Sequence, residues 1–174
     1  MVGEGVPYRE SAIAIKVRLP TDLERFRVAH VPNAALGVPA HITLIYPFLP
    51  ADVLSAAVRR LLARALAAHR PFTFRLSGVR RWPNSYYLAV EPMEPFQAIV
   101  RSLVDVFPEY PPYAGEFEYV PHVTIAEGDD PVVARLTAPS PPPASNRQRV
   151  TNVLLIAQDR DDQWRPRWRF GLGS

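Results

Sequence analysis

Hydrophobic and polar residues alternate along the segment 12–19, where apolar side chains lie on one face and Lys16 and Arg18 lie on the other. An alternation with period two is typical of a strand with one buried face. A second apolar and β-branched run at 41–46 predicts another strand, and the segment 21–29 between them predicts a short helix. The N-terminal part of the chain therefore predicts a β-α-β unit.

Helical spacing of apolar residues predicts two longer helices. Asp52 is a good N-cap for the first, whose apolar stripe includes Leu61 and which must end before Pro71. The second has Pro95 near its start and Pro108 as its stop. Both helices carry a polar face, so each is expected to pack against a sheet with its apolar stripe.

The remaining apolar segments predict five strands, at 72–79, 86–91, 121–126, 150–157 and 164–170. A short helical turn opened by Asp130 precedes the last two of them. The resulting order, β-α-β-α-β-β-α-β-α-β-β, divides into two halves of similar plan. This division indicates an internal duplication with pseudo-two-fold symmetry.

Two segments rich in proline interrupt this order. The loop 108–121 interleaves aromatic residues with acids, and loops of this length are often functional. The tract 138–144 is expected to be an extended spacer inside one domain. We therefore expect the first loop to border a functional site and the second to run over the outside of the molecule.

The pattern His-x-Thr occurs twice, as His41-Ile42-Thr43 and as His122-Val123-Thr124. On a strand, residues i and i+2 point to the same side, so each motif presents an imidazole and a hydroxyl together. Four histidines in 174 residues make two such motifs improbable by chance. The pair therefore predicts one site built from both halves.

Two imidazoles and two hydroxyls suit the cleavage of a phosphodiester at neutral pH. One neutral imidazole accepts a proton from the nucleophile while a protonated one donates to the leaving oxygen. The two threonine hydroxyls can hydrogen-bond to the phosphate oxygens as charge develops on them. This chemistry needs no cofactor and no metal ion.

Other interpretations of the same residues remain open. Each histidine could be a strand residue bonded only to the backbone. A metal site would need a third ligand, for which Glu127 is the nearest candidate. A site of this shape could also hold an RNA end or a nucleotide without turnover, or run the same chemistry in reverse as a ligase.

The paired motifs, in the segments His-Ile-Thr-Leu-Ile-Tyr-Pro-Phe at 41–48 and Pro-His-Val-Thr-Ile-Ala at 121–126, resemble those of the two-histidine phosphoesterase superfamily. The resemblance is greatest to its 2'-5' RNA ligase-like, or cyclic phosphodiesterase, branch. It implies an α+β fold with two pseudo-symmetric lobes of antiparallel sheet and outer helices around a central cleft. It also implies His41 and His122 as acid and base, with Thr43 and Thr124 binding the phosphate.

From the resemblance we expect a metal-independent phosphodiesterase that opens 2',3'-cyclic phosphates of RNA ends or nucleotides. Members that act on RNA ends often carry a basic residue just after the second motif, where this chain has Ala126-Glu127-Gly128. Lys16 and Arg18 are predicted to supply that charge, ahead of Arg80 and Arg81. Further candidates for substrate contact are aromatic residues that could stack on a base: Tyr46, Phe48, Trp82, Tyr87, Tyr113 and Tyr119.

Length and composition add limits to this interpretation. The 174 residues are expected to form a single domain over 1–174, and the absence of cysteine excludes thiolate metal sites and a cysteine nucleophile. The net charge of +3 is unevenly distributed, with an excess of acids over 105–130, and does not form the basic stripe of a duplex DNA binder. No apolar run reaches the length of a membrane span, so we expect a cytoplasmic monomer without membrane contact.

Overall fold

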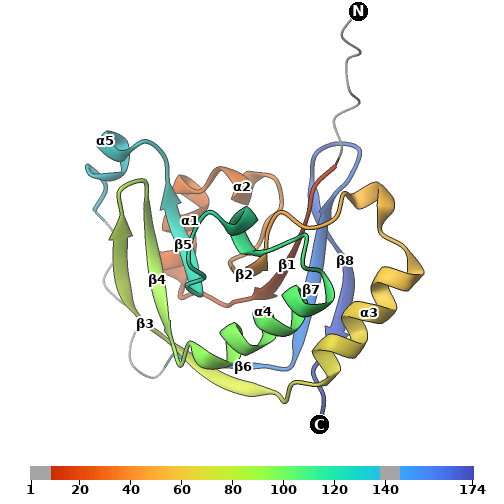
Figure 1. Ribbon diagram of the computed structural model, residues 1–174. Coiled ribbons are helices and arrows are strands. Elements are labelled where there is room, and N and C mark those ends of the chain that lie inside the picture. Colours follow the sequence, from red (N-terminus) through yellow and green to blue (C-terminus); the bar gives the residue numbers. More distant parts are fainter. Residues whose placement is uncertain (1–8, 138–145) are drawn as a thin grey trace, which may run out of the picture.

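A computed structural model describes residues 9–137 and 146–174. It confirms an α+β fold with two antiparallel four-stranded sheets (Figure 1). The strands are β1 (Ser11–Lys16), β2 (His41–Ile45), β3 (Phe72–Trp82), β4 (Ser85–Glu91), β5 (His122–Glu127), β6 (Arg147–Val150), β7 (Asn152–Gln158) and β8 (Trp164–Gly171). The helices are α1 (Thr21–His30), α2 (Pro32–Ala35), α3 (Ala56–Ala67), α4 (Glu94–Val106) and α5 (Asp130–Val133), with short 3-10 turns η1 (Ala51–Val53) and η2 (Pro112–Gly115).

The predicted duplication is visible in the strand order. The first sheet runs β2-β1-β7-β8 and the second runs β5-β4-β3-β6. In each sheet a strand, a helix and a returning strand follow one another, as β1-α1-β2 and as β4-α4-β5. The returning strand pairs antiparallel with the first and lies at the edge of its sheet. Each His-x-Thr motif therefore lies on the edge strand of its own sheet.

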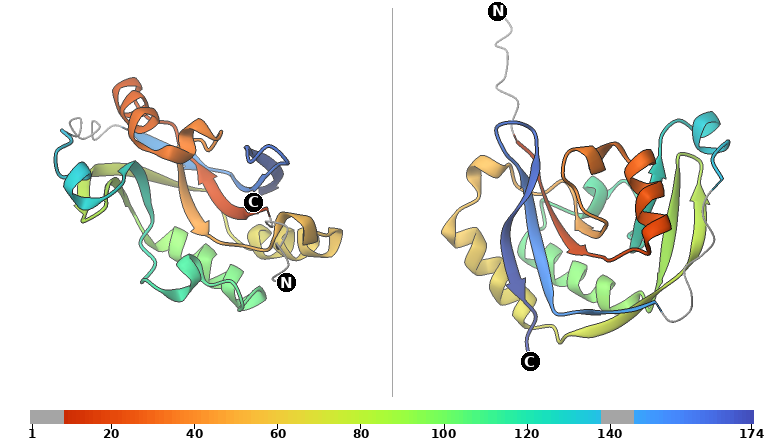
Figure 2. Two further views of the ribbon diagram at one scale, coloured as in Figure 1. Left: turned by 90° about the horizontal axis from the view of Figure 1, so that it is seen from above. Right: turned by 180° about the vertical axis from the view of Figure 1, so that it is seen from behind.

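The two helices of the repeated units cross over to the other half. α1 packs against β5, whereas α4 lies against β2. Seen from above, α1 and α4 lie on opposite sides of the two motif strands (Figure 2, left). β2 and β5 also lie beside each other. This exchange of helices holds the two edge strands together at the centre of the molecule.

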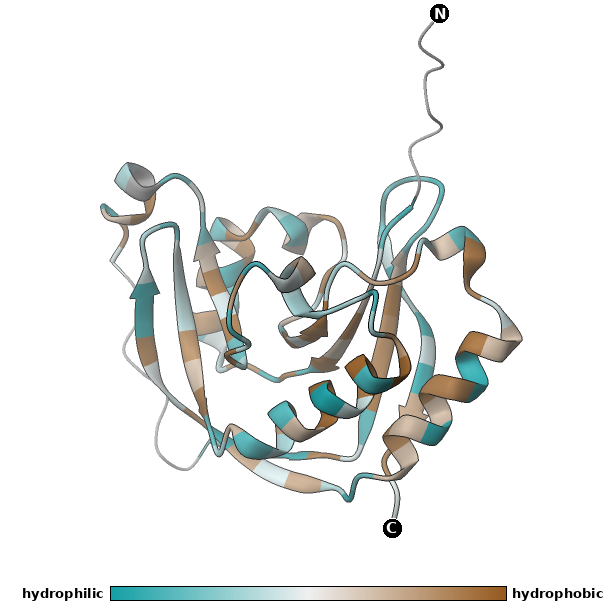
Figure 3. Ribbon diagram, viewed as in Figure 1, coloured by the Kyte–Doolittle hydropathy of each residue, from teal (hydrophilic) through white to brown (hydrophobic). Residues whose placement is uncertain are grey.

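One continuous hydrophobic core joins both sheets to the helices. Hydrophobic residues are concentrated on β1, β2 and β7 of the first sheet (Figure 3). In the second sheet, the Phe96 ring from α4 lies edge-on to Phe72 and Phe74, with ring centroids 5.0 Å and 5.3 Å apart. Such edge-to-face contacts add to the burial of apolar area, and Phe96 is fully buried. These contacts fix α4 against the second sheet.

The strand at the N-terminus is more buried than its alternation predicts. The residues expected to face solvent at its start, Ala12 and Ala14, are buried. Ala12 belongs to a second, smaller cluster with Val38 and Trp164. The chain around Val38 covers this face of the sheet, a tertiary contact that a local pattern does not report.

The predicted single strand over 150–157 is wrong in its boundaries. Residues 147–150 form β6 in the second sheet, and after Thr151 the chain continues as β7 in the first sheet. β6 was missed because its first three residues, Arg147, Gln148 and Arg149, are polar and its one apolar residue is at its end. This segment links the two sheets along one side of the molecule (Figure 1).

The start of the third helix also differs from the prediction. Its N-cap is Ser55, whose hydroxyl accepts a hydrogen bond from the Val58 backbone N–H at 3.3 Å. Asp52 lies in η1 instead and forms an ion pair with Arg9. α3 buries Leu62 and Leu66, whereas Leu61, which belongs to the predicted apolar stripe, is exposed. The prolines after the two long helices end them as expected.

The spacer tract at 138–144 lies outside the described residues. Across the described ranges, no helix combines the length and hydropathy needed to span a bilayer.

Candidate active site

β2 presents its motif side chains on the face away from the main core. Ile42 pairs with Ile15, and both are buried in the core. His41 pairs with Lys16 and Thr43 pairs with Ala14. Directly opposite residues of an antiparallel pair point to the same side, so the imidazole, the ammonium and the hydroxyl share one face.

β5 repeats this arrangement in the second sheet. Val123 pairs with the buried Leu88, while His122 pairs with Ala89 and Thr124 pairs with Tyr87. Tyr87 in turn pairs with Arg80 on β3, so this arginine, one of the weaker predictions, lies on the same face as Thr124. Both histidines and both threonines are half-buried, and each motif keeps partial access to solvent.

The two imidazoles are near enough to interact electrostatically. β2 and β5 lie side by side, and the positive charge of His122 disfavours protonation of His41. The structure therefore brings together the four residues of the two motifs, as the duplicated pattern predicts. The two rings share one electrostatic environment although they come from different sheets.

Matching backbone bonds hold the two rings in the same tautomer. Nδ1 of His41 lies 2.8 Å from the Pro39 carbonyl oxygen, and Nδ1 of His122 lies 2.7 Å from the Val120 carbonyl oxygen. A carbonyl oxygen only accepts hydrogen bonds, so Nδ1 must carry the proton and donate it. Nε2 of each neutral ring is then an acceptor, and within the described chain neither Nε2 is engaged by a protein group.

Burial lowers the pKa of both imidazoles. Desolvation is the largest cause for each ring, and it outweighs the backbone carbonyl bond, which raises the pKa. For His41 the buried Arg27 guanidinium also lowers the pKa, ahead of His122. Arg27 forms a two-pronged pair with Glu24 and donates to the Val38 carbonyl oxygen. The sequence does not predict a role for Arg27 beside His41, because its position in a predicted helix gives no sign that its side chain is buried.

Aromatic rings surround His122 on several sides. The Trp82 ring lies edge-on to the imidazole with centroids 4.7 Å apart, and Tyr87 lies at 5.5 Å. Trp82 and Tyr87 stack on each other at 3.9 Å. Trp82 is half-buried, so part of its surface remains available for contact with a ligand. These contacts fix the orientation of the imidazole and build an apolar wall beside it.

The loop 108–121 closes onto both motifs. The Tyr119 hydroxyl donates to the Thr43 carbonyl oxygen at 2.8 Å, and burial raises the pKa of this tyrosine well above its usual value. The Tyr113 ring lies 6.3 Å from the His122 ring and stacks on Tyr119 at 6.4 Å. This loop therefore borders the site as predicted, and Tyr119 carries a structural bond between the two halves.

Tyr113 has two unusual features beside the site. Its backbone φ of 52° lies in the left-handed region, which is costly for a residue with a side chain. Its hydroxyl oxygen is buried, and no group in the described chain forms a hydrogen bond to it. Burial raises the pKa of Tyr113 to about 12, so the hydroxyl is a neutral donor. Strain and an unsatisfied polar group together mark a position adapted to something other than folding stability.

Replacing Tyr113 by phenylalanine tests whether its hydroxyl serves ligand binding or only the fold. Removal of an unsatisfied buried hydroxyl is expected to leave the free energy of unfolding unchanged or to raise it by about 1 kcal/mol. If the hydroxyl donates to a bound ligand, the same variant weakens ligand binding several-fold. Urea denaturation and KM, measured on the same preparation, check both effects. A destabilised variant with an unaltered KM would assign the hydroxyl to the fold alone.

Two of the predicted aromatic contacts lie elsewhere. Phe48 is 2% exposed in the core, edge-on to Phe107 at 5.1 Å and to Tyr110 at 5.4 Å. It offers no surface to a ligand, so its prediction as a substrate contact is wrong. Tyr46 donates to the Glu10 carboxylate and lies edge-on to Trp164 at 6.4 Å, beyond the end of β2 that is remote from His41. A substrate contact by Tyr46 stays a prediction.

The basic candidates of the first strand lie next to His41. Lys16 is directly opposite His41 in the strand pair and is exposed. Arg18 lies two residues further along the chain, just beyond the end of β1. Its backbone N–H and carbonyl oxygen are hydrogen-bonded to the side-chain amide of Gln148 at 2.9 Å and 2.8 Å. In the described part of the chain, no three side chains of histidine, aspartate or glutamate gather as metal ligands would.

Two sheets joined at edge strands that each carry His-x-Thr define this protein as one with a two-histidine α+β fold. The sequence model of the 2'-5' RNA ligase superfamily matches residues 15–162. The chain therefore belongs to the 2'-5' RNA ligase superfamily. A protein of Bacillus pumilus (strain SAFR-032) named "Putative phosphoesterase" is 34% identical over 106 residues, which is 59% of each chain.

Solved structures show the same fold at low sequence identity. The crystal structure of E. coli LigT complexed with 3'-AMP has a TM-score of 0.61 and 22% identity, covering 96% of this chain and 99% of that one. LigT has also been crystallised with ATP and with NADP+. The protein TT0787 of Thermus thermophilus has a TM-score of 0.61 and 20% identity, covering 95% of this chain and 99% of that chain.

Proposed function

We propose that this protein is a metal-independent phosphodiesterase that opens 2',3'-cyclic phosphates of nucleotides or RNA ends. The observation that carries the proposal is the matched pair of imidazoles. Each ring donates its Nδ1 proton to a backbone carbonyl two residues earlier, and each has a threonine two residues later on the same face. Simple binding of an anion needs no such matched pair, whereas acid and base catalysis does.

The reaction proceeds by attack of water on the phosphorus atom. Nε2 of one neutral imidazole accepts a proton from water as the new P–O bond forms. The bond from phosphorus to one ribose oxygen breaks, and the protonated imidazole donates its Nε2 proton to that oxygen. The product is a 2'- or 3'-phosphate, and the two imidazoles have exchanged their protonation states. Exchange of protons with water restores the starting form.

The threonines and the aromatic wall have separate roles in this proposal. The hydroxyls of Thr43 and Thr124 hydrogen-bond to the non-bridging oxygens, where negative charge increases in the transition state. The half-buried Trp82 and the loop tyrosine Tyr113 lie on the His122 side and supply apolar surface for the base or ribose. Lys16 and Arg27 make the His41 side positive. A nucleotide would then bind with its base toward His122 and its other anionic groups toward His41.

Related proteins are consistent with this substrate class. LigT was crystallised with 3'-AMP, which is one product of opening adenosine 2',3'-cyclic phosphate. The B. pumilus relative is named as a phosphoesterase. Hydrolysis also requires nothing beyond water and the residues present in this site.

The test is direct turnover of uridine and adenosine 2',3'-cyclic phosphates by the purified protein, followed by separation of the 2'- and 3'-phosphate products. Full activity is expected in excess EDTA. A preparation of the variant with both histidines replaced by alanine controls for contaminating nucleases. Saturable binding without turnover would instead make the protein a nucleotide-binding module. Loss of activity in EDTA with recovery on addition of a divalent metal would contradict the metal-independent mechanism.

The lowered pKa values of the two imidazoles predict that kcat/KM is highest at acidic pH. Catalysis needs one protonated and one neutral imidazole, and both pKa values lie below the usual 6.5 because of burial. The singly protonated pair is then most populated below pH 6.5, and its fraction falls about tenfold per pH unit well above that range. We therefore expect kcat/KM to peak on the acid side of pH 6.5 and to decline toward pH 8. A maximum on the alkaline side would contradict this assignment of states.

A further inference from the structure

A groove of about 390 Å³ opens where β1 ends, between β6 and the start of β7. Its polar lining includes four cationic side chains and no acidic one. The cations are Lys16, Arg18, Arg149 and Arg169. Thr151 and Asn152 add neutral hydrogen-bonding groups. The composition of this groove favours an anion.

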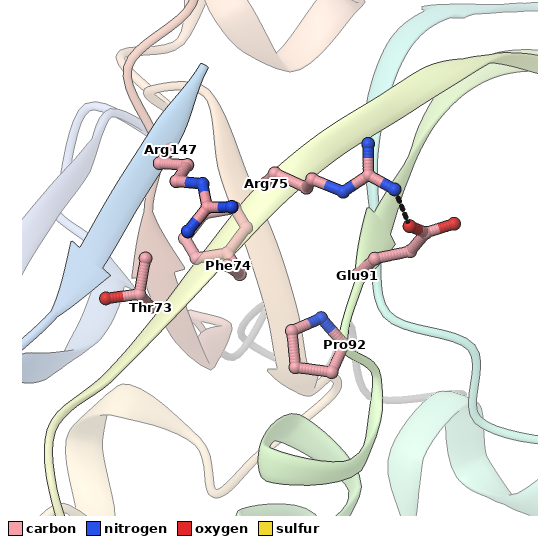
Figure 4. A pocket seen from close by; sticks show the side chains of 6 residues that line it. All are labelled: Thr73, Phe74, Arg75, Glu91, Pro92 and Arg147. Carbon is pink, nitrogen blue, oxygen red and sulfur yellow. Dashed lines mark hydrogen bonds and ion pairs between the residues drawn. The ribbon is translucent and has the colours of Figure 1, made fainter. Parts of the chain in front are cut away.

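The four cations are not neutralised by carboxylates. Within residues 9–137 and 146–174, none of them forms an ion pair, whereas Arg9, Arg27, Arg75 and Arg165 each do. A neighbouring pocket on the second sheet provides the contrast. There Arg75 and Glu91 pair with each other beside Arg147 (Figure 4). That carboxylate competes with any incoming anion, and the groove holds no equivalent.

The strand register connects this groove to the imidazoles. Lys16 is directly opposite His41 on the neighbouring strand. Thr43 is opposite Ala14, Ala14 is opposite Leu154, and Leu154 is opposite Arg169. Residues in one such row point to the same side of the sheet, and strands are spaced by about 4.8 Å. Lys16 therefore lies on the motif face beside His41, and Arg169 lies on the same side of the sheet three strands from β2, roughly 14 Å away.

The groove is built on a fixed framework. The side-chain amide of Gln148 accepts from the Arg18 backbone N–H at 2.9 Å and donates to the Arg18 carbonyl oxygen at 2.8 Å. This pair ties the end of β1 to β6 across the junction of the two sheets. Arg149 lies next to Gln148 on β6, opposite Thr73. Lys16, Arg149 and Arg169 thus project from paired strands, which hold them better than a loop would, and Gln148 holds the backbone of Arg18 just beyond the end of β1.

We propose that this groove binds a second phosphate of the substrate, the one carried on the 5' oxygen of the nucleotide whose cyclic phosphate is opened. The inference rests on the function proposed above. When the last nucleotide of an RNA carries a 2',3'-cyclic phosphate, it is joined to the rest of the RNA only through its 5' oxygen. A second phosphate on this nucleotide can therefore lie only on the 5' side. Arginine's planar fork suits two oxygens of one phosphate. The preferred substrates are therefore 5'-phosphorylated nucleotides and RNA ends, and a cyclic mononucleotide without a 5'-phosphate is a poor one.

Three substrates test the proposal and identify the source of the phosphate. They are uridine 2',3'-cyclic phosphate, the same nucleotide with a 5'-phosphate, and a uridine dinucleotide that ends in the cyclic phosphate. The 5'-phosphorylated forms are expected to show kcat/KM at least about tenfold higher than the first. An equal gain from both means that a terminal 5'-phosphate suffices. A gain with the dinucleotide alone means that the groove binds an internucleotide phosphate.

Variants of the groove should remove this preference. Arg149→Gln and Arg169→Gln are each expected to lower the ratio of kcat/KM for the phosphorylated over the unphosphorylated substrate roughly fivefold to tenfold. Each should also reduce the slope of log(kcat/KM) against log salt by about 0.7, because one cation fewer then neutralises the phosphate. Arg147→Gln is the matched control, since it lies two residues from Arg149 on the same strand but lines the other pocket.

The outcomes separate this inference from the function on which it rests. Turnover of all three substrates at equal kcat/KM would support the phosphodiesterase activity and overturn the proposal that the groove binds a 5'-phosphate. An equal effect of Arg147→Gln and Arg149→Gln would also overturn it, because only net charge would then matter. If no substrate is turned over, the proposed function fails. The groove is then tested by fluorescence anisotropy with labelled RNA that ends in a 3'-phosphate, where equal affinity of the wild type and Arg169→Gln would refute it.

Discussion

Replacing either His41 or His122 by alanine is expected to lower kcat for a 2',3'-cyclic phosphate by about 10² to 10⁴. Each variant removes one of the two groups that transfer protons, while the other ring keeps its bond to a backbone carbonyl. The two losses should not add in the double variant, because the two groups act in one transition state. Initial rates with the single and double variants measure both statements, and circular dichroism checks the fold.

A second substrate distinguishes the acid from the base. A phosphodiester with a p-nitrophenyl leaving group needs little protonation as its P–O bond breaks. The variant that lacks the general acid should therefore recover much of its activity with this substrate, whereas the variant that lacks the base should not. Similar recovery in both variants would mean that the rings do not divide the roles between them.

A histidine outside the site provides the control. Nε2 of His69 lies 2.8 Å from the Ser102 hydroxyl, remote in sequence from both motifs. His69→Gln keeps a polar group there and is expected to leave kcat within about twofold of the wild type. Wild-type rates in either His41→Ala or His122→Ala would end the two-histidine mechanism. A loss as large in His69→Gln would show that the assay reports stability and not chemistry.

Much of the fold could be predicted because its elements carry strong local patterns. The apolar stripe and the flanking prolines mark α4 closely, and the alternating apolar residues of the two motif strands mark β2 and β5. The order of elements also predicted the repeated unit. Such patterns depend only on periods of two and 3.6 residues along the chain, so no knowledge of distant contacts is needed.

The failures share one cause, which is that the partner of a segment is not visible in its own sequence. β6 exists because a mostly polar segment pairs with β3. Ala12 is buried because the chain near Val38 crosses it. Phe48 closely follows a motif strand, as Tyr46 does, yet its side chain packs in the core against Phe107. Each of these outcomes is decided by a contact between residues far apart in sequence.

The candidate site was predictable in its central residues and not in their surroundings. The repeated His-x-Thr pattern identified four side chains that the structure brings together. The backbone carbonyls of Pro39 and Val120, the buried Arg27 and the left-handed Tyr113 have no comparable signature. The two carbonyl bonds fix the tautomer of the imidazoles, and Arg27 adds to the lowering of the His41 pKa by burial, so these groups influence how the predicted residues work.

Replacing Thr43 or Thr124 by valine is expected to lower kcat by about 10² to 10³ with a smaller change in KM. Valine keeps the β-branched shape that suits a strand and removes only the hydroxyl. Both threonines are half-buried on the motif face, and across the described residues no other protein group bonds to either hydroxyl, which is therefore available to the phosphate. A donor that strengthens only as charge develops on the phosphate contributes to the rate more than to substrate binding.

Serine at the same positions tests this role of the hydroxyl. Thr43→Ser and Thr124→Ser keep the donor and should recover most of the activity that valine removes, although the freer side chain costs some of it. Thr73→Val, on the exposed face of β3, is the control for a threonine removed from a strand and should leave kcat unchanged. If the serine and valine variants lose activity equally, the threonines act through their shape, and the charge on the phosphate must be stabilised by other donors.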